Sequence, residues 1–480
     1  GTEADALVVS GRARAVPGGR LVVSPIEHPA VLDSARTAVD QLGAGLSLLE
    51  VDGAGRVELD SLARAVAPAG STDHSPASLV SVMTANNETG VVQDMAALVA
   101  RVREASGAGH PDEAGYVPVH SDVVAALGKV PVDFHGWGLD AMSLTGHKLG
   151  APVGVGALVV RRDLTLTPAT GGGRQERGIR SGTQDVVAAR ALALAVELAV
   201  AEREEQEARL AALRRRILEG AGALAGVHAT LAEGADHVAS TAHLWFEEAD
   251  AEALLMALDL AGIDASAGSA CHAGVTQPSH VLLAMGFQEG PARSTLRCSL
   301  GRETSPDDVE RLLAALPAAL EGARLVAVLT QAQDPGNAGT IIRAADAAGA
   351  DAVVLVRGSV DPTAPKVVRS TAGSLFHLPV VTGVALDDAV TALHNAGLTV
   401  LAADGRGDFD LFEAESLLEA PSAWLLGNEA HGLPSEALSR ADAVVSIPIY
   451  GKAESLNVAA AAAVCLYASA RAQAQNSGRS

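Results

Sequence analysis

The chain is poor in lysine, cysteine and aromatic residues. Of its 480 residues, four are lysine and three are cysteine, and it holds six Phe, three Trp and three Tyr. No cysteine stands in a Cys-x-x-Cys pair, which excludes a zinc knuckle and a disulfide framework and indicates a cytoplasmic protein. So few aromatic rings cannot build a base-stacking surface for single-stranded nucleic acid.

Long apolar runs and an excess of positive charge are also missing. No run reaches the roughly 18 residues of a membrane span, and no signal peptide is present, so no membrane partner is expected. The formal net charge is −22, with −16 in residues 1–323 and −6 in 324–480. Neither part is basic enough to bind RNA through bulk charge, so an RNA contact requires a local patch or a partner.

What is present is typical of several globular domains. The chain is 48% hydrophobic and 19% charged, and its length predicts two to four domains. Short Val/Leu runs alternate with helical patterns over 1–195, which indicates an α/β domain with a mainly parallel sheet. We expect one long helix over 194–225, a smaller α+β unit to a last helix at 307–320, and a second α/β domain whose first strand is 325–329.

Lys148 stands in a context that favours chemistry over a solvated surface position. It follows an apolar run in Ser143-Leu-Thr-Gly-His-Lys-Leu-Gly-Ala-Pro. A lysine that binds pyridoxal phosphate as a Schiff base needs phosphate donors nearby, and Thr145 and His147 can serve. The cofactor also needs a carboxylate at its ring nitrogen, which Asp122 can supply at the end of a preceding strand.

These residues belong to a longer set of ordered motifs. The set comprises Gly1-Thr-Glu-Ala-Asp, Glu27-His-Pro-Ala-Val, Asn86-Asn-Glu-Thr-Gly, His120-Ser-Asp, Gly146-His-Lys, the Gly171–Thr183 segment, Gly268-Ser-Ala-Cys and Ser294-Thr-Leu-Arg-Cys-Ser-Leu-Gly-Arg. With them, residues 1–322 resemble cysteine desulfurases of the NifS/IscS type, which are fold-type I pyridoxal-phosphate enzymes of the class V aminotransferase family. The resemblance implies a large domain over 1–200 and a small domain over 201–322 that carries a cysteine loop.

The resemblance also implies a role for each matching residue. Lys148 would hold the cofactor, His28 would stack on its ring, and Asp122 would keep its nitrogen protonated. Thr2, Thr145 and His147 would bind its phosphate. Thr183 would reach the cofactor of a partner subunit, which implies a homodimer. Asn87, next to the cofactor, and Arg297 would hold the carboxylate of the substrate L-cysteine.

Cys271 would take the sulfur atom, leaving alanine and a persulfide for a sulfur-acceptor protein, either an iron–sulfur scaffold or a tRNA thiolase. Its run of small residues suits a mobile, exposed thiol, whereas Cys298 and Cys465 fit buried structural positions. Two departures stand out. Ala125 occupies the place of a Gln in the family, and the family has a further segment before Gly1, so the chain is expected to be a fragment at its start.

Three segments stand out in the last third of the chain. They are Asp334-Pro-Gly-Asn-Ala-Gly-Thr-Ile-Ile-Arg, Trp424-Leu-Leu-Gly-Asn-Glu-Ala-His-Gly-Leu and Ile447-Pro-Ile-Tyr-Gly-Lys-Ala-Glu-Ser-Leu-Asn-Val. A Gly/Asn turn is expected to open a helix that carries Arg343 one and a half turns in. A buried strand ends in a Gly turn, and an Ala-rich helix is expected to be capped near Ser455. The Rossmann pattern G-x-G-x-x-G is absent.

In order and spacing these segments resemble the motifs of SpoU/TrmH RNA ribose 2′-O-methyltransferases, of the SPOUT class. For 323–480 the resemblance implies an α/β trefoil-knot domain, S-adenosylmethionine as cofactor, and a site formed across a homodimer. Cofactor contacts would come from Leu426, Gly427, Ile447 and Leu456. The catalytic and substrate positions would be Asn337, Arg343, Glu429, Ser455 and Asn457. A ribose hydroxyl needs a base or strong electrostatic help to react, which Arg343 and Glu429 could provide.

The sequence therefore predicts a cysteine desulfurase fused to an RNA (tRNA or rRNA) 2′-O-methyltransferase. Three alternatives remain open. Only the methyltransferase is active and residues 1–322 are a scaffold or interaction module; or the first part is another fold-type I enzyme, such as an aminotransferase; or the join is a truncation or a gene-model artefact. The sequence names neither the RNA nor the sulfur acceptor.

Overall fold

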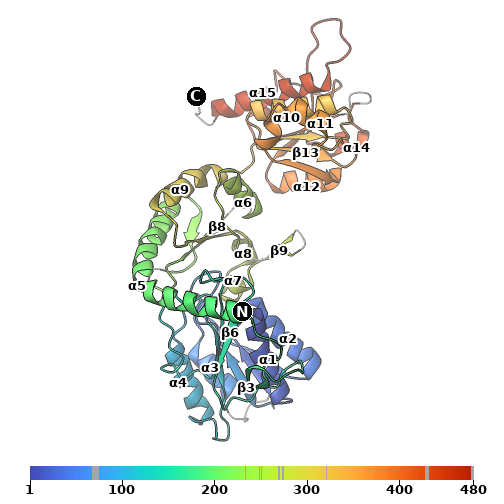
Figure 1. The fold of residues 1–480 in the computed structure, drawn as a ribbon. Helices are drawn as coiled ribbons and strands as arrows, with labels where there is room; N and C mark the ends of the chain where they lie inside the picture. Colours follow the sequence, from blue (N-terminus) through green and yellow to red (C-terminus); the bar gives the residue numbers. More distant parts are fainter. Residues whose placement is uncertain are drawn as a thin grey trace. The chain divides into compact units, whose positions relative to one another are not determined.

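The computed structural model describes residues 1–67, 75–232, 234–247, 249, 251–268, 271–272, 275–320, 322–427 and 432–476. The side chains of Leu260, Cys271–His272, Val275–Thr276, Ala318 and Asn476 lie outside this description. The chain forms two compact units, unit 1 over Gly1–Pro317 and unit 2 over Ala318–Ser480 (Figure 1). Within the described ranges, no helix is both long and apolar enough to cross a bilayer.

Unit 1 is built on a six-stranded sheet with the order β2-β1-β3-β4-β5-β6. All pairings are parallel except that of β5 with the edge strand β6. The strands are β1 Arg20–Val23, β2 Gly45–Leu48, β3 Ala77–Ser81, β4 Val119–Asp122, β5 Ala141–Thr145 and β6 Gly156–Val160. The mainly parallel sheet expected from the sequence is confirmed.

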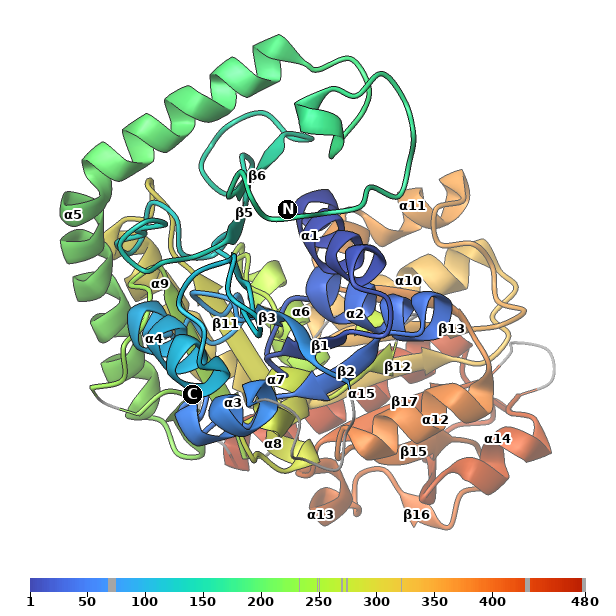
Figure 2. The ribbon, with the colours of Figure 1, turned by 90° about the horizontal axis from the view of Figure 1, so that it is seen from below.

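Helices cover both faces of this sheet. The pair α1 Thr2–Ala15 and α2 Pro29–Leu42 lies on one face, and α3 Leu59–Val66 and α4 Met95–Ser106 lie on the other (Figures 1 and 2). Alternate β1 residues serve the two cores, because Leu21 and Val23 pack with α1 and α2 whereas Val22 packs with α3 and α4. Successive side chains of a strand point to opposite faces, and helices cover both faces of this sheet. The consecutive β1 residues Leu21, Val22 and Val23 are therefore all apolar.

A 37-residue helix, α5 Val186–Gly222, leads from the large sheet to a smaller α+β part. The helix begins eight residues earlier than the sequence pattern indicated, because Asp185 accepts a hydrogen bond from the Ala188 N–H and so caps it. It also runs across the expected domain boundary at residue 200.

The smaller part holds a three-stranded antiparallel sheet, β11-β8-β7, and a two-stranded hairpin, β9-β10. Its elements are β7 Val227–Ala229, β8 Thr241–Phe246, α6 Ala251–Leu260, β9 Cys271–His272, β10 Val275–Thr276, α7 His280–Ala284, α8 Glu289–Arg293, β11 Thr295–Ser299 and α9 Pro306–Leu320. The short helix η1 Glu176–Gly178 precedes α5 and lies by the large sheet, since Arg177 donates to the Val160 carbonyl.

Unit 2 contains a seven-stranded, wholly parallel sheet with the order β14-β13-β12-β17-β15-β18-β16. Its strands are β12 Leu325–Leu329, β13 Ala352–Val356, β14 Val380–Val384, β15 Thr399–Ala403, β16 Phe409–Asp410, β17 Ser422–Leu426 and β18 Ala443–Ser446. Its helices are α10 Pro335–Ala347, α11 Pro365–Thr371, η2 Ser374–Phe376, α12 Leu386–Asn395, α13 Glu415–Leu418, α14 Ser435–Arg440 and α15 Val458–Asn476. The trefoil knot stays a prediction from the family.

The core of unit 2 surrounds Trp424 on the central strand β17. This side chain has no exposed surface, and its indole Nε1 donates a hydrogen bond of 2.9 Å to Ser469 Oγ on α15. Helices α10 and α15 share that core, whereas α12 and α14 pack on the other face of the sheet. The carboxyl end of β17, where the second motif begins, is therefore held rigidly.

Candidate functional sites

The predicted cofactor residues of unit 1 gather where the parallel strands end. Asp122 is the last residue of β4, and Thr145 is the last residue of β5, five residues before the turn at Gly150. The start of α1 lies beside them, because the Gly1 nitrogen is 3.1 Å from the point that a Cβ on Gly156 would occupy, and Gly156 pairs with Thr145. Ligands of open α/β sheets bind at this edge, and a helix N-terminus favours a phosphate.

Thr145 and His147 contact each other directly. Thr145 Oγ1 lies 3.0 Å from His147 Nδ1, and the hydroxyl also reaches the Val155 carbonyl at 3.3 Å. Thr2 occupies the first position of α1, whose N-terminal N–H groups are free of helical partners by geometry. This part of the edge therefore offers hydroxyl, imidazole and amide donors of the kind that hold a phosphate.

Lys148 lies on the exposed turn that follows β5. Its charge lowers the pKa values of His28 and His147, after the larger effect of burial on each, so it lies close to both rings. His28 Nδ1 accepts a hydrogen bond of 3.1 Å from the Ala30 N–H and so caps α2. The lowered pKa keeps this ring neutral, which suits stacking on a flat cofactor.

Asp122 is part of a cluster of three buried carboxyl groups that the sequence did not reveal. Burial raises the pKa of Asp122 to about 6, and that of Asp5 to about 8 with help from Asp122. Burial and the charge of Asp122 also raise the pKa of Glu27 well above its usual value. Asp5 Oδ1 and Glu27 Oε2 have no hydrogen-bond partner. With Asp5 and Glu27 protonated, Asp122 carries the negative charge of this buried site at neutral pH, and a protonated pyridine nitrogen would balance that charge.

A neutral histidine supports the same cluster. His120 hydrogen-bonds Ser81 and Ser143 at 2.9 Å each, and its Nε2 lies 3.8 Å from Asp5 Oδ1. Burial lowers its pKa to about 3, so it adds no charge. Asp5, Glu27 and His120 all stand inside the quoted motifs, next to the residues that were predicted, and that adjacency was the signal that could have found them.

The predicted substrate residues also meet. Arg297 on β11 donates from Nη1 to the Asn87 backbone carbonyl at 3.0 Å, and its buried Nε has no partner. The contact uses the main chain of Asn87 and leaves its side chain available. A guanidinium group with an unpaired N–H can accept a carboxylate.

Other predicted positions of unit 1 are less closely joined. Thr183 is exposed on the loop before α5. The Cys271 backbone pairs with Thr276 in the β9-β10 hairpin, but its side chain lies outside the described residues. Ala125 is half-buried in the turn after β4. Cys298 and Cys465 are buried free thiols, as expected, and burial raises the pKa of each to about 12.

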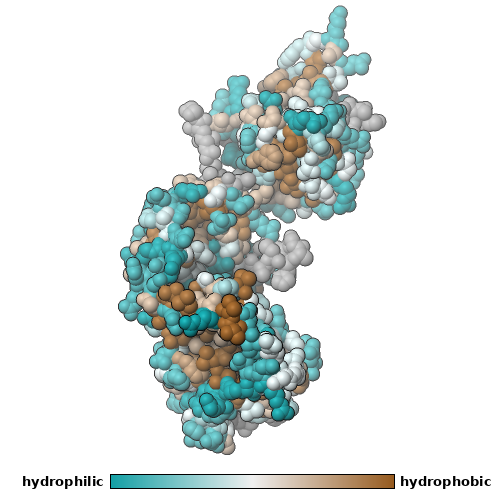
Figure 3. All heavy atoms as spheres, in the orientation of Figure 1, coloured by the Kyte–Doolittle hydropathy of each residue, from teal (hydrophilic) through white to brown (hydrophobic). Residues whose placement is uncertain are grey.

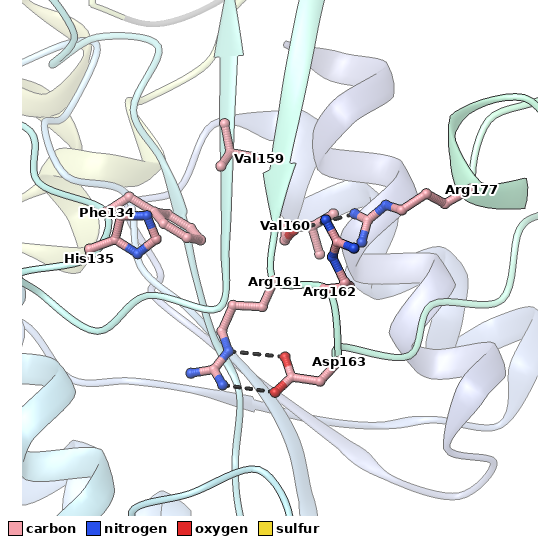
Figure 4. Close-up of a pocket in the computed structure, with 8 residues that line it drawn as sticks. All are labelled: Phe134, His135, Val159, Val160, Arg161, Arg162, Asp163 and Arg177. Atoms are coloured by element: carbon pink, nitrogen blue, oxygen red, sulfur yellow. Dashed lines mark hydrogen bonds and ion pairs between the residues drawn. The ribbon is translucent and has the colours of Figure 1, made fainter.

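An arginine-lined hollow lies at the other end of the same sheet. Arg161, Arg162 and Arg177 surround it together with Phe134 and His135 (Figure 4). It opens beside Val160, which pairs with the first residue of β5, whereas the cofactor residues follow the last. Arg161 is already held by Asp163 at 2.8 and 3.1 Å, and the hollow contributes nothing to the site around Lys148.

In unit 2 the structure joins the first and third motifs. Asn457 Nδ2 donates to Asn337 Oδ1 at 3.3 Å, and Asn457 Oδ1 accepts from the Ala459 N–H at 2.9 Å. The cap of α15 is therefore Asn457 and not Ser455, which lies two residues earlier on an exposed loop. A side-chain oxygen caps a helix only at the residue just before it.

The first motif also differs in detail from the prediction. Asp334 accepts from the Asn337 N–H at 2.8 Å and caps α10, so Asn337 lies inside the first helical turn and not in a preceding loop. Arg343 is eight residues after the first residue of α10, about two turns in and not one and a half. It is exposed and lies roughly 9 Å along the axis from Asn337.

At the end of β17, the second motif brings the backbone of Gly427 close to the backbone of Gly432. The Leu426 carbonyl accepts from both the N–H and the Oγ1 of Thr330 at 2.9 Å. A Cβ on Gly427 would lie 2.5 Å from the Gly432 carbonyl carbon, so only glycine fits. Ile447 is half-buried and Leu456 is 41% exposed. Glu429 lies outside the described residues.

Comparison with known proteins gives two family matches. Residues 1–312 match the class-V aminotransferase family, and residues 324–467 match the SpoU rRNA methylase family. An IscS-like cysteine desulfurase of Mycobacterium tuberculosis is 44% identical over 336 residues, which cover 68% of this chain and 81% of that protein. The cysteine desulfurase NifS of Azotobacter vinelandii is 36% identical over 70% of this chain and 81% of its own length.

A solved structure agrees with these matches. The NifS-like protein from Rickettsia africae has a TM-score of 0.57 and 27% identity, covering 67% of this chain and 79% of that one. Both resemblances predicted from the sequence are confirmed, and so is the α/β class of both units.

Proposed function

The chain belongs to the class-V aminotransferase family, is similar to cysteine desulfurases and also carries a SpoU methylase segment, so we propose that it joins two transferases. Unit 1 converts L-cysteine to L-alanine and an enzyme-bound persulfide with pyridoxal phosphate. Unit 2 methylates an RNA ribose 2′-hydroxyl with S-adenosylmethionine. The main support for the desulfurase activity is the buried cluster of Asp5, Glu27 and Asp122. It lies at the edge of the sheet that also bears Lys148.

The residues of unit 1 fit pyridoxal phosphate. Lys148 would hold the aldehyde carbon, and Asp122, the charged member of the buried acid cluster at neutral pH, would pair with the ring nitrogen. Thr145 and His147, with the start of α1 at Thr2, hold the phosphate. The bound cofactor supplies an electron sink for breaking bonds at the substrate carbon atoms.

The remaining residues orient the substrate and receive its sulfur. Arg297 binds the L-cysteine carboxylate, with Asn87 beside it, and His28 covers the ring as a neutral imidazole. Cys271 takes the sulfur atom: the substrate carbon–sulfur bond breaks, a sulfur–sulfur bond forms, the carbon that lost sulfur gains the proton given up by the thiol, and alanine leaves. A persulfide then passes to an acceptor protein, an iron–sulfur scaffold or a tRNA thiolase.

The experiment compares wild type with Lys148→Ala and Cys271→Ser. We expect the visible absorbance of bound pyridoxal phosphate in wild type, its loss in Lys148→Ala, and its retention in Cys271→Ser without persulfide formation. Lys366→Ala, which removes an exposed lysine of unit 2, is the matched control. A colourless wild type supplied with the cofactor contradicts the proposal and favours the scaffold alternative, whereas Cys271→Ser with full transaminase turnover favours an aminotransferase.

For unit 2 we propose that Leu426, Gly427, Ile447 and Leu456 form the S-adenosylmethionine site, with Asn337, Arg343, Ser455, Asn457 and Glu429 at the reacting hydroxyl. Support comes from the contact between Asn337 and Asn457, and from the close backbone approach at Gly427, which holds the end of β17 rigidly. A labelled-methyl assay on tRNA and rRNA tests it, with Arg343→Ala expected to lower the rate at least tenfold. Unchanged transfer by that variant contradicts the assignment.

We further propose a cytoplasmic homodimer. Its support in unit 1 is apolar surface along the first half of α5, where brown atoms gather in Figure 3. Val186 and Val187 are 75% and 81% exposed, and Leu194 and Leu198 are about half exposed. Thr183 precedes this surface, as expected for a residue that reaches a partner's site. Val187→Glu should yield monomers on sedimentation and lower desulfurase activity, whereas a dimeric variant contradicts the proposal.

Fusion of the two activities suggests a shared RNA target. We propose that the persulfide of unit 1 feeds tRNA thiolation. Transfer of labelled sulfur from the purified protein to a tRNA-thiolation partner tests this link, and its absence, with an active desulfurase, counts against it.

A further inference from the structure

The segment that carries Cys271 is fastened at its first end to strand β11. Gly268 donates its N–H to Thr295 Oγ1 at 3.1 Å, and Ser266 exchanges two backbone hydrogen bonds with Arg297, at 2.6 and 3.2 Å. Two residues lie between Gly268 and Cys271, so the Cα atoms of Gly268 and Cys271 are at most about 11 Å apart. The segment therefore leaves β11 beside Arg297, the residue proposed to bind the substrate carboxylate.

Gly268 sits against a polar surface that excludes any larger residue. A Cβ there would lie 2.7 Å from His243 Nε2 and 3.2 Å from Thr295 Oγ1. The His243 ring cannot retreat easily, because its Nδ1 is held by Thr230 Oγ1 at 2.7 Å and the residue is buried. His243 Nε2 itself has no hydrogen-bond partner.

The second end of the segment is fastened at Ser279 and His280. Ser279 Oγ donates to Glu88 Oε2 at 2.6 Å and also accepts from the Leu282 N–H at 3.2 Å, which caps α7. His280 Nε2 lies 3.1 Å from the backbone carbonyl of Glu27, the neighbour of His28. This end is therefore held beside the residue proposed to cover the cofactor ring.

Glu88 holds the second end of the segment and lies close to the first. Its Oε2 atom, which accepts from Ser279, is also 3.4 Å from the point that a Cβ on Gly268 would occupy. The residue is 6% exposed, and Asn86 Oδ1 fixes its backbone N–H at 2.9 Å. Its neighbour Asn87 supplies the carbonyl that holds Arg297.

We propose that Glu88 is a positioning residue for sulfur transfer: its carboxylate holds the second end of the Cys271 segment through Ser279 and lies beside the first end at Gly268, next to Arg297. The inference rests on the proposed desulfurase activity of unit 1. It assigns Glu88 no contact with substrate or cofactor. Ser279 is the partner through which the carboxylate acts, since one hydrogen bond joins them.

The test is a double-mutant cycle with Glu88→Ala, Ser279→Ala and the double variant, each in the full chain loaded with pyridoxal phosphate. Glu88→Gln keeps an oxygen that can accept the hydrogen bond from Ser279. It provides a second variant for the test if Glu88→Ala does not fold. Glu50→Ala, which removes an exposed glutamate hydrogen-bonded to Arg64 at 2.8 Å, is the matched control. The readouts are the visible cofactor absorbance, kcat and KM for L-cysteine, and amide exchange over 266–268 and 279–283.

Glu88→Ala should lower kcat at least tenfold, because a buried hydrogen bond to a charged group is lost. KM should stay within about threefold and the absorbance should persist, since neither Arg297 nor Lys148 is altered. Ser279→Ala should act in the same direction, the double variant should be no worse than Glu88→Ala, and Glu88→Gln should lie between. Exchange should quicken at both ends of the segment.

Three outcomes overturn the inference. Either alanine variant retains full kcat and slow exchange; or Glu88→Ala loses the cofactor absorbance or raises KM as kcat falls, which marks general damage; or kcat falls while exchange at both ends is unchanged. If wild type releases no alanine, the proposed function fails, and the exchange measurements still decide whether Glu88 fastens the segment.

Discussion

At the scale of single residues, the acid cluster of unit 1 ties stability to pH. Asp5 faces Asp122 and Glu27, the neutral His120 and the amino group of Gly1. Its pKa is raised from 3.8 to about 8, mainly by burial and then by Asp122. Between those values the folded protein keeps a proton that the unfolded chain has released, so the free energy of unfolding falls as the pH rises.

Asp5→Asn removes this dependence. Relative to wild type, the cofactor-free variant should gain about 2–4 kcal/mol of stability between pH 5 and pH 8. Urea unfolding of both proteins at the two pH values measures the gain. The exposed residue Asp33, paired only with Arg36, provides the control as Asp33→Asn. An equal wild-type-to-variant difference at both pH values contradicts the prediction.

The individual site residues were unevenly predictable. Lys148 and Asp122 follow strand-like runs, so sequence alone places both at one edge of a parallel sheet. From the sequence alone, Asp5, Glu27 and Glu88 cannot be distinguished from surface acids. Only the structure shows that their carboxyl groups are buried. A sequence pattern reports helix and strand periods, and it reports the desolvation of an isolated acid poorly.

At the scale of elements, the start of helix α15 is linked to helix α10 through one capping residue. Asn457 performs two tasks with two atoms, capping α15 through Oδ1 and holding Asn337 through Nδ2. The sequence located this helix start within two residues, and it placed strand β12 at its observed bounds. Terminal turns are harder to predict because several Ser, Asn and Asp residues compete for one capping position.

Asn457→Ala and Asn457→Asp separate the two tasks. The alanine variant loses the cap and should lower the stability of unit 2 by about 1 kcal/mol. Aspartate caps equally well, so it should retain stability while losing the donor to Asn337, and methyl transfer should fall. Denaturant unfolding and the labelled-methyl assay check these outcomes. A fully active Asn457→Asp variant would show that the contact with Asn337 is dispensable.

At the scale of the whole molecule, the chain is two compact units with separate cores. The proposed cofactors bind different units. Each should therefore stabilise only the unit that binds it, by about 2.7 kcal/mol when its concentration is a hundred times the dissociation constant.

Thermal unfolding should consequently show two transitions. Pyridoxal phosphate should raise the midpoint of one, and S-adenosylmethionine the midpoint of the other. Differential scanning calorimetry with each ligand measures both, and Lys148→Ala should abolish only the first shift. A single transition raised by either ligand would mean that the units unfold as one cooperative body.

The position of Trp424 gives these experiments a built-in optical probe. The other two tryptophans, Trp137 and Trp245, belong to unit 1, so Trp424 is the sole indole of unit 2. Its ring is fully buried, and it stands two residues before Leu426 in the sequence. In a chain whose Trp137 and Trp245 are replaced by phenylalanine, the red shift of the remaining emission would time the opening of the methyltransferase half alone.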